Sequence, residues 1–147
     1  MYRRTFARVD LGAYAANVRA LRRMIGGDTK LLAVVKADAY GHGLVPVART
    51  AEKAGADWLG VALAEEGETL RGAGIRLPIL ILGPANEAGT RAAVKSGLTM
   101  AVFTPSHIRM AQQSAEATGL EAQVHIKLDT GMNRVGVKTA EELSALL

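Results

Sequence analysis

Apolar runs alternate with amphipathic segments along most of the chain. Short runs rich in Val, Ile and Leu predict β-strands, and the segments between them repeat apolar residues at the three-to-four-residue spacing of a helix. The predicted strands span residues 31–36, 58–63, 78–82, 98–103 and 123–128. The predicted helices span residues 11–25, 45–54, 64–73, 86–96, 105–119 and 139–147. Strands and helices that alternate every twenty to twenty-five residues or so predict a parallel β/α architecture, and they fit a barrel and an open sheet equally well.

Polar residues, prolines and glycines mark the predicted helix ends. Asp10 is placed to cap the first helix, and Gly26-Gly27 ends its apolar pattern. Thr104-Pro105 supplies a cap and a first-turn proline to a later helix. Thr139 and Glu142 have the spacing of a capping box, which predicts a helix start near the end of the sequence.

The segment of residues 31–43, LLAVVKADAYGHG, organises the chain. Its apolar start reads as a strand buried on both faces, and Lys36 follows at the C-terminal end before a turn rich in small residues. Val34 and Lys36 share one face, because side chains alternate along a strand. An amine at the end of a strand, partly shielded from solvent, is a candidate nucleophile. Taken alone, a strand-end lysine more often extends to solvent.

Composition and charge narrow the function classes. The chain has 147 residues, 49% hydrophobic and 22% charged, which suits one soluble domain. It contains no cysteine, which excludes disulfides and thiolate catalysis, and neither His107 nor His125 has a second ligand at metal-site spacing. The N-terminus lacks a secretory signal and no apolar run reaches membrane-spanning length, so we expect a cytoplasmic protein with no membrane partner.

The basic residues are scattered along the chain. The net charge is +4, without a dense basic block interleaved with aromatics, so we expect no nucleic-acid partner. Arg19, Arg22 and Arg23 lie off the apolar stripe of the first helix, and we expect them to form a solvated face.

Two segments resemble signatures of the alanine racemase family. VVKADAYGHG resembles the motif of its pyridoxal-phosphate lysine, and HIKLDTGMNRVGV at residues 125–137 resembles a second signature in the expected order. The resemblance implies pyridoxal 5'-phosphate as cofactor and an eight-stranded (β/α)8 TIM-type barrel. This chain would hold the first five strand-helix units of the N-terminal barrel domain. Three strands and a β-rich second domain would be absent.

The resemblance also assigns roles to individual residues. Lys36 would bind the cofactor covalently and then carry the substrate α-proton, and Tyr40 would hold the cofactor phosphate. Arg134 would stabilise the phenolic oxygen of the cofactor, which suits a permanently charged planar donor. Lys127 matches a lysine that many members carboxylate to orient this arginine. Without the resemblance, Tyr40 reads as a partly buried tyrosine, and Lys127 as a salt-bridged or solvent-directed lysine.

Other residues near these motifs have simpler readings. Val34 and Leu82 would pack beside the cofactor ring or merely fill a barrel. Asp129 begins the sequence Asp-Thr-Gly, which predicts a turn in which its carboxylate accepts hydrogen bonds from backbone N–H groups. His42 is most simply a local hydrogen-bond partner.

The implied function is the interconversion of L- and D-alanine for cell-wall precursors, with a small amino-acid substrate. The family works as a homodimer whose partner subunit supplies a second base, so the isolated chain would be inactive or weakly active, or would need a complementary C-terminal half. Three alternatives stay open: a racemase for serine or several amino acids, a non-catalytic pyridoxal-phosphate-binding barrel protein, and a structural module that associates through open sheet edges.

Overall fold

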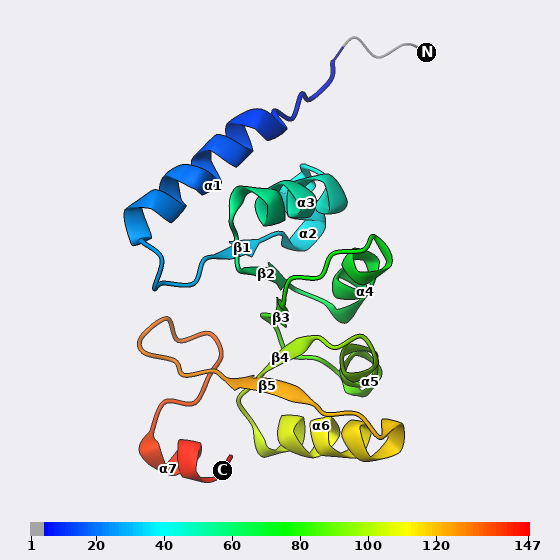
Figure 1. Cartoon of the computed structure of the whole chain (residues 1–147). Helices are drawn as coiled ribbons and strands as arrows, with labels where there is room; N and C mark the ends of the chain where they lie inside the picture. Colours follow the sequence, from blue (N-terminus) through cyan, green and yellow to red (C-terminus); the bar gives the residue numbers. More distant parts are fainter. Residues whose placement is uncertain (1–4) are drawn as a thin grey trace.

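The computed structural model describes residues 5–147 and shows one parallel sheet whose strands follow one another in the order β1-β2-β3-β4-β5 (Figure 1). The strands are β1 (Leu32–Val34), β2 (Trp58–Val61), β3 (Ile79–Ile81), β4 (Thr99–Val102) and β5 (Gln123–Ile126). The helices are α1 (Leu11–Ile25), α2 (Lys36–Gly41), α3 (Leu44–Ala54), α4 (Ala64–Gly72), α5 (Glu87–Lys95), α6 (Pro105–Thr118) and α7 (Ala140–Ser144). Within the described residues, every helix is too short or too polar to cross a membrane.

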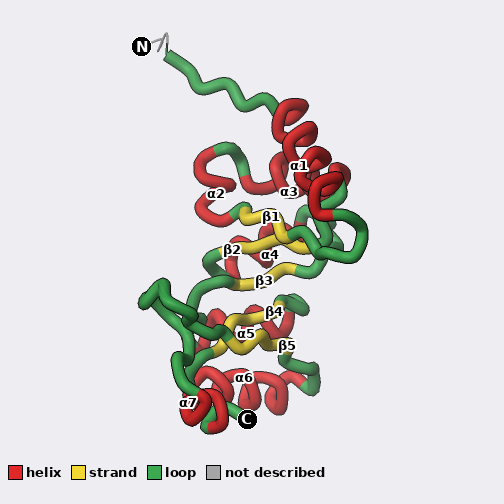
Figure 2. The backbone as a smooth tube through the Cα atoms, turned by 90° about the vertical axis from the view of Figure 1, so that its left-hand side faces the viewer, coloured by secondary structure: helices red, strands yellow, loops and turns green. Residues whose placement is uncertain are grey.

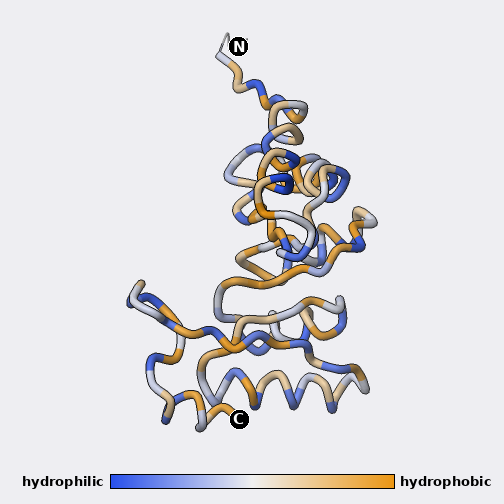
Figure 3. Tube along the Cα trace, turned by 60° about the vertical axis from the view of Figure 1, so that its left-hand side comes forward, coloured by the Kyte–Doolittle hydropathy of each residue, from blue (hydrophilic) through white to orange (hydrophobic). Residues whose placement is uncertain are grey.

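The sheet has two unlike faces. Alternate residues such as Leu59, Ile79 and Ile81 are at most 1% exposed and form the core with the covering helices. Figure 3 shows hydrophobic stretches along the strands and alternation along the helices. Sequential strand order with this single helix-covered face is the arrangement of a β/α barrel, whereas a doubly wound sheet is covered on both faces. The predicted α/β class is confirmed, and the fold is consistent with a partial TIM barrel.

The helix-end signals hold in the structure. Asp10 accepts a hydrogen bond from the backbone N–H of Ala13 at 2.9 Å, and Gly26 ends α1 with a φ of 74°. Thr104 caps α6 in the same way. At α7 the box is shifted, because the Glu142 carboxylate accepts from the N–H of Lys138 instead of the cap residue.

Two expectations about the first strand were wrong. β1 ends at Val34, so Lys36 is the first residue of α2 and not the end of the strand. β1 is also not buried on both faces: it is an edge strand, and Val34 is 40% exposed on the face that the helices leave uncovered. Val35, just beyond the strand, is fully buried, as predicted.

Arg22 was wrongly expected to face solvent. Its guanidinium donates to the backbone oxygens of Gly55 and Thr29 and forms an ion pair with Asp57. The Asp57 carboxylate also accepts from the backbone N–H of Leu31 at 2.7 Å. Arg22 therefore ties the end of α1 to the start of β1 and to the turn before β2, at the end of the sheet opposite the candidate site.

Candidate functional site

The segment after β1 forms a left-handed helical turn. Residues 37–40, Ala-Asp-Ala-Tyr, have φ values from 53° to 55°, although none is glycine. The sequence predicted a turn here but not its hand. Left-handed backbone costs L-residues roughly 1–2 kcal/mol each, so a run of them persists only where surrounding contacts hold it.

Short-range hydrogen bonds brace this turn. Asp38 accepts from the backbone N–H of Leu44 at 2.7 Å, which joins the turn to the start of α3. The backbone N–H of Ala39 donates to the oxygen of Val35 at 2.8 Å. His42 Nδ1 donates to the oxygen of Ala39 at 2.9 Å, so its expected role as a local hydrogen-bond partner is confirmed.

A longer-range contact comes from α4. One carboxylate oxygen of Glu66 accepts from the backbone N–H of Ala37 at 2.6 Å. Its other oxygen accepts from the N–H groups of Ala62 and Leu63 at 2.7 and 3.1 Å, just beyond β2. Glu66 thus joins the segments that follow β1 and β2.

The turn places Lys36 beside Tyr40. Lys36 Nζ lies 5.9 Å from the centre of the Tyr40 ring, within cation–π range. The Lys36 residue is partly buried, and within the described part of the chain its ammonium has no carboxylate within ion-pair distance. Tyr40 is 61% exposed, so its phenol is accessible to a ligand.

Val34 and Leu82 flank Gly60 on the uncovered face of the sheet. A Cβ atom at position 60 would lie 3.1 Å from Leu82 Cδ1, 3.5 Å from Val34 Cγ2 and 2.8 Å from Leu32 Cδ2. Glycine at position 60 in β2 therefore leaves room for apolar side chains from β1 and from the residue after β3. These side chains form an apolar floor next to the strand that leads into the Lys36 turn.

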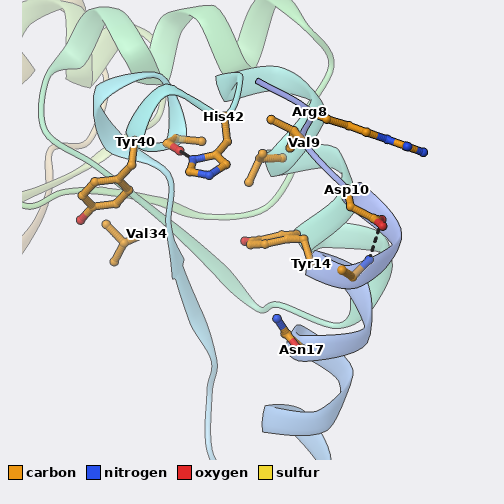
Figure 4. Close-up of a pocket in the computed structure, with 11 residues that line it drawn as sticks. Arg8, Val9, Asp10, Tyr14, Asn17, Val34, Tyr40 and His42 are labelled. Atoms are coloured by element: carbon orange, nitrogen blue, oxygen red, sulfur yellow. Dashed lines mark hydrogen bonds between the residues drawn. The ribbon is translucent and has the colours of Figure 1, made fainter. Parts of the chain in front are cut away.

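A hollow of about 540 Å³ opens between α1 and the turn (Figure 4). Tyr14 extends from α1 towards the space below His42, Val34 lies below the Tyr40 ring, and Arg8 extends away. Burial raises the pKa of the Tyr14 phenol, so that it stays a neutral hydrogen-bond donor near neutral pH.

The loop after β5 presents Arg134. Lys127 continues β5, since its N–H donates to the oxygen of Val102 at 2.9 Å. The loop then folds back onto the end of this strand. The N–H of Val137 donates to the backbone oxygen of Lys127 at 2.9 Å, and the N–H of Asp129 donates to the backbone oxygen of Val137 at 2.8 Å. Arg134 is exposed and borders a second hollow, of about 400 Å³, together with Phe103.

Asp129 shapes this loop. Its Oδ1 accepts from the N–H groups of Asn133 and Gly131, each at 3.0 Å, as expected for turn chemistry. These hydrogen bonds, Asn133 first, hold the pKa of the Asp129 carboxyl below its usual value. The loop and the α2 turn both follow C-terminal strand ends of one parallel sheet, and Figure 2 shows them on the same side of it.

Comparison with known proteins identifies the family. The family model described as "Alanine racemase, N-terminal domain" matches residues 9–147. The chain belongs to the alanine racemase family. The alanine racemase of Symbiobacterium thermophilum is 50% identical over 139 residues, which cover 95% of this chain and 37% of that protein. This chain therefore spans little more than a third of the length of the curated alanine racemases it matches.

Solved racemase structures share the fold. The alanine racemase of Bacillus anthracis with bound L-Ala-P superposes with a TM-score of 0.90 at 38% identity, over 99% of this chain and 38% of that one. A histidine racemase from Leuconostoc mesenteroides superposes with a TM-score of 0.83 at 34% identity, over 92% of this chain and 36% of that one. The same fold thus occurs in racemases named for different amino acids.

In this alanine racemase domain, the structure gathers some of the predicted residues and separates others. Lys36, Tyr40 and Val34 lie together at the end of β1, and Leu82 and Val34 both border the space above Gly60. Arg134 lines a different hollow from Tyr40, at the same end of the sheet. Sequence reasoning missed the contacts of Glu66, because a glutamate in an acidic first helical turn looks like an ordinary helix-start residue.

The residues present fit a pyridoxal-phosphate group. The fit rests on a lysine without an ion-pair partner in the described chain, an accessible phenol beside it, and apolar side chains around Gly60 against which a ring could pack. Lys36 would hold the aldehyde carbon, Tyr40 a phosphate oxygen, and Arg134 the phenolic oxygen.

Proposed function

We propose that this chain is the cofactor-lysine part of a pyridoxal-phosphate-dependent racemase that interconverts L- and D-alanine. The observation that carries the proposal is Lys36 on its braced left-handed turn, next to Tyr40 and the apolar floor around Gly60. The name of the Symbiobacterium relative and the L-Ala-P in the Bacillus anthracis structure support alanine as the substrate.

The chemistry that pyridoxal phosphate supplies when bound is an electron sink for negative charge at the substrate α-carbon. Lys36 Nζ then serves as the proton carrier on one face of that carbon: its amine takes the α-proton and its ammonium returns one. Tyr40 would hold a phosphate oxygen of the cofactor and Arg134 its phenolic oxygen, and the two contacts would fix the cofactor relative to Lys36.

Racemisation needs proton transfer on both faces of the α-carbon. Lys36 serves one face, and we assign the other to a tyrosine of a partner subunit, as the family resemblance implies. The working protein would then be a cytoplasmic homodimer that supplies D-alanine for cell-wall precursors. Carboxylation of Lys127, which precedes the Arg134 loop, belongs to the same proposal.

A second candidate is a racemase for another amino acid. It is favoured by the histidine racemase from Leuconostoc mesenteroides, which shares this fold at 34% identity. The chain would keep the same Lys36 chemistry and differ only in the substrate side chain that it accepts.

Isotope exchange tests the proposed function. Because Lys36 serves one face of the α-carbon, the chain is incubated in D₂O with pyridoxal phosphate and, in separate samples, with each enantiomer of alanine, serine and histidine. Deuterium at the α-carbon is measured by mass spectrometry. We expect incorporation that is fastest for alanine and abolished in Lys36→Arg. Exchange that persists in Lys36→Arg would contradict the role of Lys36, and faster exchange with serine or histidine would support the second candidate.

A further inference from the structure

Lys36 is bracketed by two backbone hydrogen bonds to different elements. On its N-terminal side, the N–H of Val35 donates to the oxygen of Gly60 at 2.8 Å, which is the last rung to β2. On its C-terminal side, the N–H of Ala37 donates to Glu66 at 2.6 Å. The peptide group of Ala37 contains the carbonyl of Lys36 in one rigid plane, so a contact that fixes this N–H also orients the Lys36 backbone.

The Glu66 contact reaches the turn at its first left-handed residue. Ala37 has a φ of 53°, and three more residues with positive φ follow it. The remaining hydrogen bonds of the turn come from within residues 35–44, whereas Glu66 is 29 residues away in α4. It therefore anchors the strained turn to an element whose position the core already fixes.

The two oxygens of the Glu66 carboxylate allow it to join two segments of backbone. One oxygen takes the Ala37 N–H while the other takes the N–H groups of Ala62 and Leu63. Hydrogen bonds to an ionised acceptor are stronger than neutral ones. A glutamine keeps only one acceptor oxygen, so it cannot serve both segments at once.

We propose that Glu66 is a positioning residue, which holds the Lys36-bearing turn in its left-handed form by tying the Ala37 N–H to the end of β2. This inference rests on the proposed function in so far as Lys36 is the cofactor lysine. Glu66 itself need not touch the cofactor or the substrate. Its effect on Lys36 passes through the Ala37 peptide group.

The test combines two measurements on the full chain and on the variants Glu66→Gln and Glu66→Ala. The first is amide hydrogen exchange at Ala37, which needs no cofactor. The second is the rate at which pyridoxal phosphate with borohydride labels Lys36, divided by the rate at exposed Lys95 in the same digest. Glu65→Gln is the matched control, because its side chain is the exposed neighbour of Glu66 in α4.

In Glu66→Ala we expect Ala37 exchange about tenfold faster and a several-fold lower Lys36-to-Lys95 ratio, with Glu65→Gln unchanged on both counts. In Glu66→Gln both the Ala37 exchange rate and the labelling ratio should lie between those of Glu66→Ala and those of the unmodified chain. A purely structural role in capping α4 would lower thermal stability and speed exchange at Ala62 and Leu63 but leave the labelling ratio unchanged, which would overturn the proposal.

The two proposals fail separately. If the unmodified chain shows no preference for Lys36, the cofactor role fails, and Ala37 exchange alone decides whether Glu66 holds the turn. If the unmodified chain labels Lys36 and neither Glu66 variant changes the ratio or the exchange, the positioning role fails while the cofactor role stands.

Discussion

Lys36 Nζ lies 5.9 Å from the centre of the Tyr40 ring, across a turn whose last four residues have left-handed backbone. A right-handed helix would also bring residues four apart together, but it would leave the end of β1 in a different direction. The hand of this turn thus sets where the pair lies relative to the sheet.

Replacing a left-handed alanine by glycine should stabilise the protein. At exposed Ala37, glycine removes roughly 1–2 kcal/mol of backbone strain from the folded state. It also destabilises the folded state by about 0.5–1 kcal/mol, because glycine has more conformational freedom in the unfolded chain. The strain effect is larger, so we expect Ala37→Gly to raise the free energy of unfolding by about 0.5–1 kcal/mol. Ala16→Gly, at an exposed right-handed position in α1, should instead lower it by about 1 kcal/mol. Urea unfolding measures both, and equal losses would show that Ala37 is not strained.

Gly136 should tolerate no side chain. Its φ is 129°, and a Cβ atom there would lie 2.7 Å from the backbone nitrogen of Asp129, where no flexible group can move aside. Gly136→Ala should therefore destabilise the protein by about 2 kcal/mol or more and speed amide exchange at Val137. Gly72→Ala is the control, since nothing lies within 4 Å of a Cβ atom at that position. If both variants behaved alike, the close return of the loop that carries Arg134 would be in doubt.

Arg22→Ala should destabilise the fold far from the site. The change removes hydrogen bonds to the oxygens of Gly55 and Thr29 and the partner of Asp57, at a cost of about 2 kcal/mol or a Tm lower by about 4–8 °C. Arg19→Ala, at an exposed position of the same helix, should leave the Tm nearly unchanged. Calorimetry of the two variants measures the difference in Tm. Similar Tm values for both would mean that the Arg22 contacts do not contribute to the stability of the fold.

Asp57 should make stability fall in acid. Its hydrogen bond from the Leu31 N–H, followed by that from Arg22, lowers its pKa in the folded protein. Because the folded pKa lies below the unfolded one, the stability that Asp57 contributes is complete above the ordinary aspartate pKa of about 3.9 and is lost as the pH falls through the folded value. NMR titration should find a midpoint below 3.9, and Asp57→Asn should flatten the pH dependence of unfolding in that range. A midpoint at or above 3.9 would contradict this assignment.

The helices and strands could be predicted from local signals in the sequence. The features that could not be predicted depend on contacts between residues far apart in the chain. Asp10 and Thr104 cap helices as expected because each cap involves residues three positions apart. The left-handed turn could not be predicted, since alanine favours right-handed helices and the contact from Glu66 comes from 29 residues away. Arg22 was misassigned for the same reason: its partners Gly55 and Asp57 lie 33 and 35 residues along the chain.

The candidate site also combines residues that local motifs predict with a feature that depends on distant parts of the chain. Local motifs predict Lys36, Tyr40 and Arg134 as site residues, and the parallel sheet puts their segments at one end. The gap left by Gly60 between Val34 and Leu82 depends on the register of β1, β2 and β3, which no single segment encodes.

The most direct measurement is the distribution of a pyridoxyl label after the chain is mixed with pyridoxal phosphate, reduced with borohydride and digested. Solvent access alone would favour exposed Lys53 and Lys95 over partly buried Lys36. We expect Lys36 to carry most of the label, and Lys36→Arg to lose the visible absorption of the bound cofactor. A label spread over Lys53 and Lys95, with Lys36 no richer than they are, would contradict the proposal that this turn holds the cofactor.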